Sequence, residues 1–138
     1  MESTPLIEAA KYNFCQALHI LLERGARDTP AGPHSNTALH FAAKCGCLTC
    51  VRDLVEYGSN LRQKDSRGRT ALVIAAYYGH LKVVQFLVNR ISNDLEEIMI
   101  EEVNMAITVA AVNVSAKIKH LILLELNFLK WRSNDLFR

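Results

Sequence analysis

Apolar residues between Gly68 and Val88 fall in two helix-length stretches with a glycine between them. The stretch ALVIAAYY precedes Gly79, and the stretch LKVVQFLV follows His80. A single amphipathic helix of this length would not carry a helix-breaking glycine at its centre. The pattern therefore predicts two short helices that are separated by a turn at Gly79.

The same pattern occurs three times at a constant interval. The segments TPLIEAAKYNFCQALHILLERGA, TALHFAAKCGCLTCVRDLVEYGS and TALVIAAYYGHLKVVQFLVNRIS begin at Thr4, Thr37 and Thr70, and both intervals are 33 residues. The initial threonine, an alanine pair and a leucine of the second apolar stretch recur in register. This period, with its T-[PA]-L-x-x-A-A start, resembles the ankyrin repeat from about residue 2 to residue 90.

The resemblance implies an all-α fold, a solenoid of stacked helix–turn–helix units with short hairpin or turn fingers. We expect three repeats in residues 1–90, with bounds near 2–36, 37–69 and 70–90. Residues 91–138 are expected to hold an acidic helix and then a divergent fourth repeat that serves as a C-terminal helical cap. Ala110–Ala111 and Leu121-x-x-Leu124 repeat the earlier pattern there with a drift in spacing.

Several residues of the repeat have a physical role at the ends of the helices. A threonine side chain at the start of each first helix accepts a hydrogen bond from an amide that the helix leaves unpaired. Gly46 and Gly79 are predicted to adopt the left-handed conformation that ends the first helix, and Asn13 takes this place in the first repeat. Asp65 and Gly68 mark the turn of the second finger, whereas the first linker, ARDTPAGPHSNT, lacks that pair. We therefore expect a first finger that is stiffer and differently shaped.

The overall composition excludes several classes of protein. A net charge of +2 with 22% charged residues indicates neither a polybasic nucleic-acid binder nor an acidic disordered tail. No apolar run approaches the roughly 20 residues of a membrane span, and MESTPLIEAAK has no secretory-signal pattern. The four cysteines lie close together in the repeats rather than spread as a disulfide framework, and we interpret them as reduced thiols. These features predict an intracellular protein, located in the cytoplasm, the nucleus or both.

Catalytic motifs are not found in the sequence. It contains neither a phosphate-binding loop nor a G-x-S-x-G elbow, so we expect neither an enzyme nor a cofactor. The best candidates for metal ligands are His40, Cys45, Cys47 and Cys50. The glycine between Cys45 and Cys47 sends these side chains in different directions, and a closed zinc site needs four convergent ligands. A metal site is therefore disfavoured, and a cysteine-based metal or redox sensor stays an alternative function.

The resemblance implies a non-enzymatic interaction module that acts as an adaptor, inhibitor or scaffold. Similar proteins hold a partner protein on the concave face of the stack and on the finger tips. Transfer of the family's contact positions, repeat by repeat, gives the expected partner-binding residues. They are Lys11, Tyr12, Pro33, His34, Asn36, Lys44, Cys45, Lys64, Ser66, Arg67, Arg69, Tyr77 and Tyr78. Tyrosine and arginine are enriched at interface hot spots, which favours Tyr77, Tyr78 and Arg67 as anchors.

The distribution of charge favours one kind of partner. Residues 1–90 carry eleven Lys/Arg and seven Asp/Glu, whereas residues 91–138 carry five and seven. The positive excess on the repeats favours an acidic segment of another protein. Nucleic acid is disfavoured because neither a reading helix nor a sheet of stacked aromatic residues accompanies the cations.

Two further alternatives concern the ends of the stack. Self-association through the terminal repeats is one, because we expect Ile7, Phe14 and Leu18 to be partly exposed. The other is recruitment of a substrate to a larger, ubiquitin-ligase-like assembly. In that case the apolar segment from Leu121 to Trp131 would dock the assembly.

Overall fold

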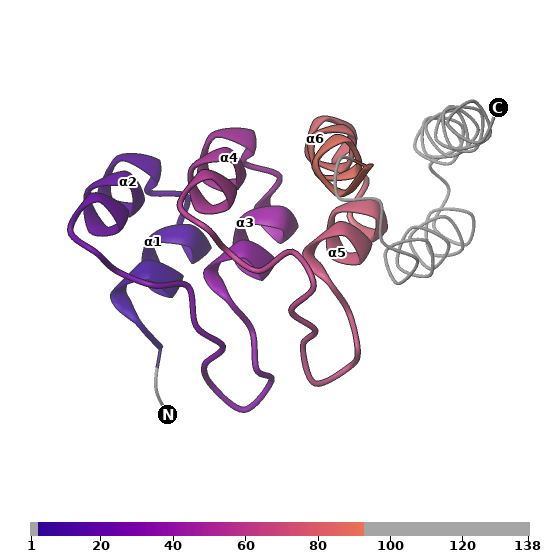
Figure 1. Cartoon of the computed structure of the whole chain (residues 1–138). Coiled ribbons are helices and arrows are strands. Elements are labelled where there is room, and N and C mark those ends of the chain that lie inside the picture. The colour runs from indigo at the N-terminus through magenta and orange to yellow at the C-terminus, as the bar shows by residue number, and fades with distance from the viewer. Residues whose placement is uncertain (1–2, 93–138) are drawn as a thin grey trace, which may run out of the picture.

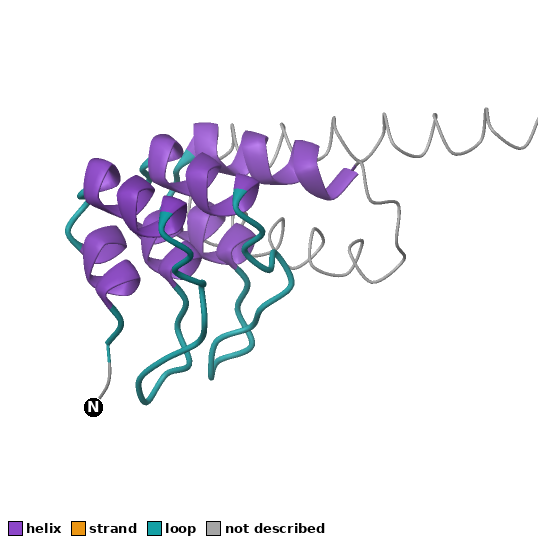
Figure 2. Ribbon diagram, turned by 60° about the vertical axis from the view of Figure 1, so that its left-hand side comes forward, coloured by secondary structure: helices purple, strands orange, loops and turns teal. Residues whose placement is uncertain are grey.

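The computed structural model describes residues 3–92, which form six helices and their connecting loops. The helices are α1 (Pro5–Lys11), α2 (Cys15–Glu23), α3 (Ala38–Cys45), α4 (Leu48–Glu56), α5 (Ala71–Tyr77) and α6 (Leu81–Ser92). Figure 1 shows them in two rows, with α1, α3 and α5 in one and α2, α4 and α6 in the other. The loops between repeats extend beyond the first row as two fingers (Figure 2).

Packing follows the repeat. Helix α3 contacts both α1 and α5, and α4 contacts both α2 and α6. Across residues 3–92 the β-structure consists of one isolated bridge between Ala31 and Asn36 in the first finger. The predicted all-α stack of helix–turn–helix units is confirmed. None of the helices in this part of the chain combines the length and the apolar character that crossing a membrane requires.

Threonine side chains begin the first helices as predicted. The Oγ1 atom of Thr4 accepts a hydrogen bond from the amide of Ile7 at 3.2 Å. Thr37 accepts from the amide of His40 at 3.2 Å, and Thr70 accepts from the amide of Val73 at 3.4 Å. Each bond satisfies one amide that the first turn of a helix leaves without a backbone partner.

The turn inside each repeat has the predicted backbone conformation. Gly46 and Gly79 have φ angles of 75° and 76°, and Asn13 has a φ angle of 62° at the same place in the first repeat. Helix α5 ends at Tyr77 and α6 begins at Leu81. The glycine at the centre of the apolar region therefore separates two helices rather than interrupting one.

The core lies between the two rows and consists mainly of leucine, valine and alanine side chains. The alanine pairs of all three repeats are buried, because small side chains let neighbouring first helices approach closely. The expectation that Ile7 and Leu18 are partly exposed is wrong, since both are buried. Their side chains belong to the single hydrophobic core, which includes residues of all three repeats. The expectation is correct for Phe14, which is 62% exposed.

The two fingers are built differently, as the sequence predicts. The first finger turns through Gly32 and Ser35, which have φ angles of 77° and 51°, beside the bridge between Ala31 and Asn36. The second finger turns at Gly68, whose amide donates to the carbonyl oxygen of Asp65 at 3.0 Å. The acidic helix and the divergent fourth repeat that we expect beyond residue 92 lie outside the described residues.

Candidate functional site

The first helices α1, α3 and α5 all end in residues that face solvent. Lys11 and Tyr12 end α1, Lys44 precedes the last residue of α3, and Tyr77 and Tyr78 end α5. Tyr12, Tyr77 and Tyr78 are 59%, 47% and 44% exposed. Their exposure is notable because the hydrophobic effect favours burial of large aromatic side chains. We call these five residues the aromatic–basic strip.

Cations and rings of the strip lie close to one another. The Nζ atom of Lys44 lies 5.7 Å from the ring centroid of Tyr78, so α3 and α5 share one contact. The Nζ atom of Lys11 lies 5.9 Å from the ring of Tyr12 and 6.0 Å from the half-buried ring of Phe41. Such contacts are favourable because the face of an aromatic ring carries a negative electrostatic potential that attracts a cation. They connect the ends of α1, α3 and α5 into one surface.

Tyr78 is also held from the turn that follows it. Its ring stacks on His80 with centroids 6.5 Å apart and meets Tyr77 edge-on at 5.0 Å. The Nε2 atom of His80 lies 2.8 Å from the carbonyl oxygen of Lys44. The His80 ring also occupies the space where a side chain at Gly46 would lie. Two neighbouring repeats therefore fix the position of this aromatic group.

The finger tips are joined by a backbone hydrogen bond. The amide of Ser66 donates to the carbonyl oxygen of His34 at 2.9 Å. Inside the second finger the carboxylate of Asp65 accepts from the amides of Arg67 and Arg69, both at 2.9 Å. Burial acts to raise the pKa of Asp65, but these bonds and the Arg69 guanidinium outweigh it and lower the pKa. The finger is thus organised around an ionised carboxylate.

Asp28 organises the first finger, a role that no pattern in the sequence indicates. Its carboxylate accepts from the amides of Ala38 and Leu39, at 2.6 and 3.1 Å, and from the hydroxyl of Ser59 at 3.0 Å. Burial raises the pKa of Asp28, while these hydrogen bonds act in the opposite direction. One repeat later the corresponding residue is Leu61, so the periodicity could not identify this role.

The structure divides the thirteen expected contact residues into two groups. Asn36 and Arg69 are half-buried, and the Nε atom of Arg69 donates to Asp65 at 3.0 Å, so Arg69 supports the finger. The others are exposed. They are Lys11, Tyr12, Pro33, His34, Lys44, Cys45, Lys64, Ser66, Arg67, Tyr77 and Tyr78.

The four candidate metal ligands do not converge. The ring of His40 accepts from the amide of Thr37 at 3.0 Å through Nδ1, and its Nε2 lies 2.9 Å from the carbonyl oxygen of Arg69. Burial lowers the pKa of His40, against the opposing effects of that carbonyl group and of the carboxylates of Asp65 and Asp28. Cys45 is exposed, and its Sγ atom lies 3.6 Å from the carbonyl oxygen of Lys11.

A different set of cysteines comes together. The Sγ atoms of Cys15, Cys47 and Cys50 lie within 4.8 Å of one another. The prediction that all four cysteines are reduced is wrong, because Cys15 and Cys50 form a disulfide. The sequence held a usable signal for this group. The position 33 residues after Cys15 is 48, which lies between Cys47 and Cys50. Because equivalent positions of adjacent repeats stack on one another, Cys15 should lie close to both of these cysteines.

Comparison with known proteins agrees with this architecture. A family model of ankyrin repeats, in three copies, matches residues 6–97. The chain belongs to the ankyrin-repeat family. The Notch-regulated ankyrin repeat-containing protein A of Danio rerio is 34% identical over 87 residues, which are 60% of this chain and 78% of that protein.

Two other relatives match over smaller shares of their own length. XBAT31 of Arabidopsis thaliana, which carries the name of an E3 ubiquitin-protein ligase, is 39% identical over 82 residues. These residues are 59% of this chain but 18% of that protein. The DNA replication inhibitor plutonium of Drosophila melanogaster is 40% identical over 57 residues, 41% of this chain and 33% of that protein. As an ankyrin-repeat protein, the chain is a protein-interaction module.

Proposed function

We propose that this ankyrin-repeat chain binds an acidic segment of a partner protein across the aromatic–basic strip and the two finger tips. The observation that supports the proposal is the end of each first helix. Three successive repeats place an exposed aromatic or cationic side chain at the same structural position. Packing does not require this arrangement, because these side chains lie outside the core.

The strip offers two complementary kinds of contact. The tyrosine rings are large and have few rotatable bonds, so their ordering on binding costs little conformational entropy. Lys11 and Lys44 lie over ring faces, which limits the freedom of their ammonium groups before a partner arrives. Carboxylates of a partner would pair with these cations while its apolar groups cover the rings. Attraction between opposite charges would raise the association rate more than the final affinity.

The charge of the exposed surface supports an acidic partner. Lys64 and Arg67 are exposed on the second finger, and Lys11 and Lys44 are exposed at the ends of α1 and α3. Within residues 3–92 the exposed acidic residues are Glu23 and Glu56. Both end helices of the other row, α2 and α4. An acidic segment on the strip would therefore meet cations first.

The names of the relatives suggest what such binding would do. Plutonium is named as an inhibitor, and binding that masks a functional surface of a partner protein is one route to inhibition. XBAT31 is named as a ligase, and its similarity extends over 59% of this chain. Recruitment of a substrate to a larger assembly is therefore a second candidate. The segment proposed to dock that assembly, Leu121 to Trp131, lies outside the described residues.

A pair of charge-reversal variants tests the site. Partners captured by the wild-type chain would be identified, purified and titrated calorimetrically against Lys44→Glu/Arg67→Glu. The control, Arg24→Glu/Lys82→Glu, makes the same change in net charge at two other exposed positions, directly after α2 and within α6. We expect the first variant to bind about tenfold more weakly and the control to bind within about twofold of wild type. Equal losses in both variants, with unchanged melting temperatures, would place the interaction elsewhere.

A further inference from the structure

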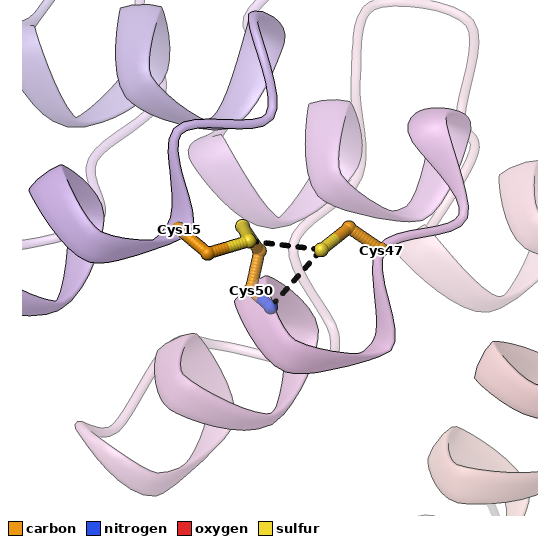
Figure 3. A group of neighbouring side chains, drawn as sticks. All are labelled: Cys15, Cys47 and Cys50. Atoms are coloured by element: carbon orange, nitrogen blue, oxygen red, sulfur yellow. Dashed lines mark hydrogen bonds between the residues drawn. A yellow bond between two sulfur atoms is a disulfide. The ribbon is translucent and has the colours of Figure 1, made fainter.

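Three cysteine side chains converge between the first and second repeats. Cys15 begins α2, Cys47 caps the start of α4, and Cys50 lies in the first turn of α4. Figure 3 shows the three sulfur atoms directed toward one point between these helices. Cys50 is buried, and Cys15 and Cys47 are half-buried, so solvent reaches one side of the group.

A disulfide accounts for two of the three sulfur atoms. Cys15 and Cys50 are joined, and the Sγ atom of Cys47 lies 2.9 Å from the Sγ atom of Cys15. Cys47 also accepts a hydrogen bond from the amide of Cys50 at 3.5 Å, as a helix-capping residue does. Capping alone would be served as well by serine. Neither the disulfide nor the capping of α4 therefore explains why the sulfur atom of Cys47 lies beside the other two.

Three converging thiolates are a ligand set for soft cations. Thiolate sulfur selects zinc, cuprous copper and iron–sulfur clusters over hard cations such as magnesium. The N-terminal ends of α2 and α4 carry partial positive charge, which stabilises the negative charge of thiolates placed there. The Oδ1 atom of Asn13 lies 3.6 Å from the Sγ atom of Cys15 and 4.0 Å from that of Cys50. This oxygen lies beside the sulfur atoms, where it can serve as a further ligand.

We propose that, in the reduced chain, Cys15, Cys47 and Cys50 form a three-thiolate site for one thiophilic cation, zinc or cuprous copper. The bound cation links the second helices of the first two repeats, where the disulfide links them in the oxidised chain. Each thiol loses its proton to solvent when its sulfur binds the cation. The disulfide and the metal exclude each other, because the disulfide removes two of the three ligands.

Metal titration of the reduced chain tests this proposal. A phosphine in anaerobic buffer reduces the disulfide: the phosphine becomes its oxide with oxygen from water, and each sulfur gains one electron and one proton. Cuprous copper and zinc would then be titrated separately, each in competition with a chromogenic chelator. We expect one equivalent of at least one of these metals to bind to the wild-type chain. The metal that binds identifies the cation.

Two serine variants make the test specific. Cys47→Ser removes one proposed ligand but keeps a good helix-capping side chain, so α4 should still begin normally. Cys45→Ser removes a thiol outside the group and serves as the control. We expect metal affinity to fall at least about tenfold in Cys47→Ser and to stay unchanged in Cys45→Ser.

Three results would overturn the proposal. They are binding of neither metal by the reduced wild-type chain, equal losses in the two variants, and full affinity in Cys47→Ser. If Cys47→Ser melts at a lower temperature than wild type, Cys15→Ser would be measured in its place. This variant removes a ligand from α2, and its metal affinity is compared with that of Cys45→Ser in the same way.

Discussion

The two halves of each first helix differ in what constrains their residues. In α3, Ala42 and Ala43 are completely buried against neighbouring helices, whereas Lys44 and Cys45 are exposed. In α5, Ala75 and Ala76 are buried and are followed directly by exposed tyrosines. Close approach of the helices requires alanine at the buried positions in every repeat. Packing places no such requirement on the exposed ends, and there the three repeats differ.

The difference has a functional consequence. The exposed residues vary from repeat to repeat, whereas the buried alanines of the scaffold do not. Contact residues can therefore change without loss of the fold. The comparison therefore predicts large effects on stability at the buried halves and small ones at the exposed ends. Effects on binding should follow the opposite order.

The largest loss of stability is expected from leucine in place of a buried alanine. Ala42→Leu inserts extra carbon atoms where α3 packs in the stack, and we expect a loss of about 1–3 kcal/mol in the free energy of unfolding. Lys44→Leu, two residues later and exposed, should change it by less than about 0.5 kcal/mol. Urea unfolding measures both. Similar losses in the two variants would contradict the division of the helix into two halves.

A smaller but specific effect is expected at the turns. Gly79→Ala puts a side chain on a backbone with positive φ, where nothing lies within 4 Å of the new methyl group, so strain alone costs about 1 kcal/mol. Gly46→Ala adds a collision with the His80 ring, which bonds to Lys44. We expect it to cost about 1 kcal/mol more than Gly79→Ala. Equal losses in thermal melts of the two variants would show that the His80 ring moves aside without cost, and a larger loss in Gly79→Ala would contradict the prediction.

Protonation of His40 tests the buried start of α3. Burial lowers the folded pKa of His40 below its ordinary value of 6.5, so at mildly acidic pH the unfolded chain binds more protons than the folded chain. The stability that the neutral ring contributes is complete above pH 6.5 and decreases as pH falls through the folded pKa.

Replacement by glutamine isolates this contribution. The variant His40→Gln would keep a side-chain acceptor for the amide of Thr37 but would not titrate. Urea midpoints at about pH 7 and pH 5 should therefore decrease less in the variant than in the wild-type chain. Equal decreases would mean that the ring of His40 is protonated in the folded state as easily as in the unfolded state.

Sequence periodicity predicted the parts of the fold that recur and missed those that occur once. Thr37 and Gly46 were identified because each has a counterpart 33 residues away. Asp28, which holds the start of α3, has no counterpart, and its three hydrogen bonds depend on tertiary structure. Arg69 was assigned to the binding surface because its position matches a contact position of the family. Its bond to Asp65 could not be inferred from that match.

The cysteines show a further limit of periodic reasoning. Cys15 and Cys50 are 35 residues apart, not 33, and are therefore not equivalent positions. They meet because the starts of α2 and α4 pack together, although Cys15 is the first residue of α2 and Cys50 is the third residue of α4. A residue-by-residue alignment of the repeats compares equivalent positions only, so it did not place these two side chains in contact.

Affinity measurements on two tyrosine variants test most directly whether the exposed ends of the first helices bind the partner. Tyr78→Ala removes a ring from the aromatic–basic strip, and Tyr57→Ala removes a ring of similar exposure, 48% against 44%, at the end of α4. Both should change the free energy of unfolding by less than about 0.5 kcal/mol. We predict that Tyr78→Ala weakens binding of the captured partner about tenfold and that Tyr57→Ala leaves it unchanged. Full affinity in Tyr78→Ala, or an equal loss in Tyr57→Ala, would contradict the assignment of recognition to the ends of the first helices.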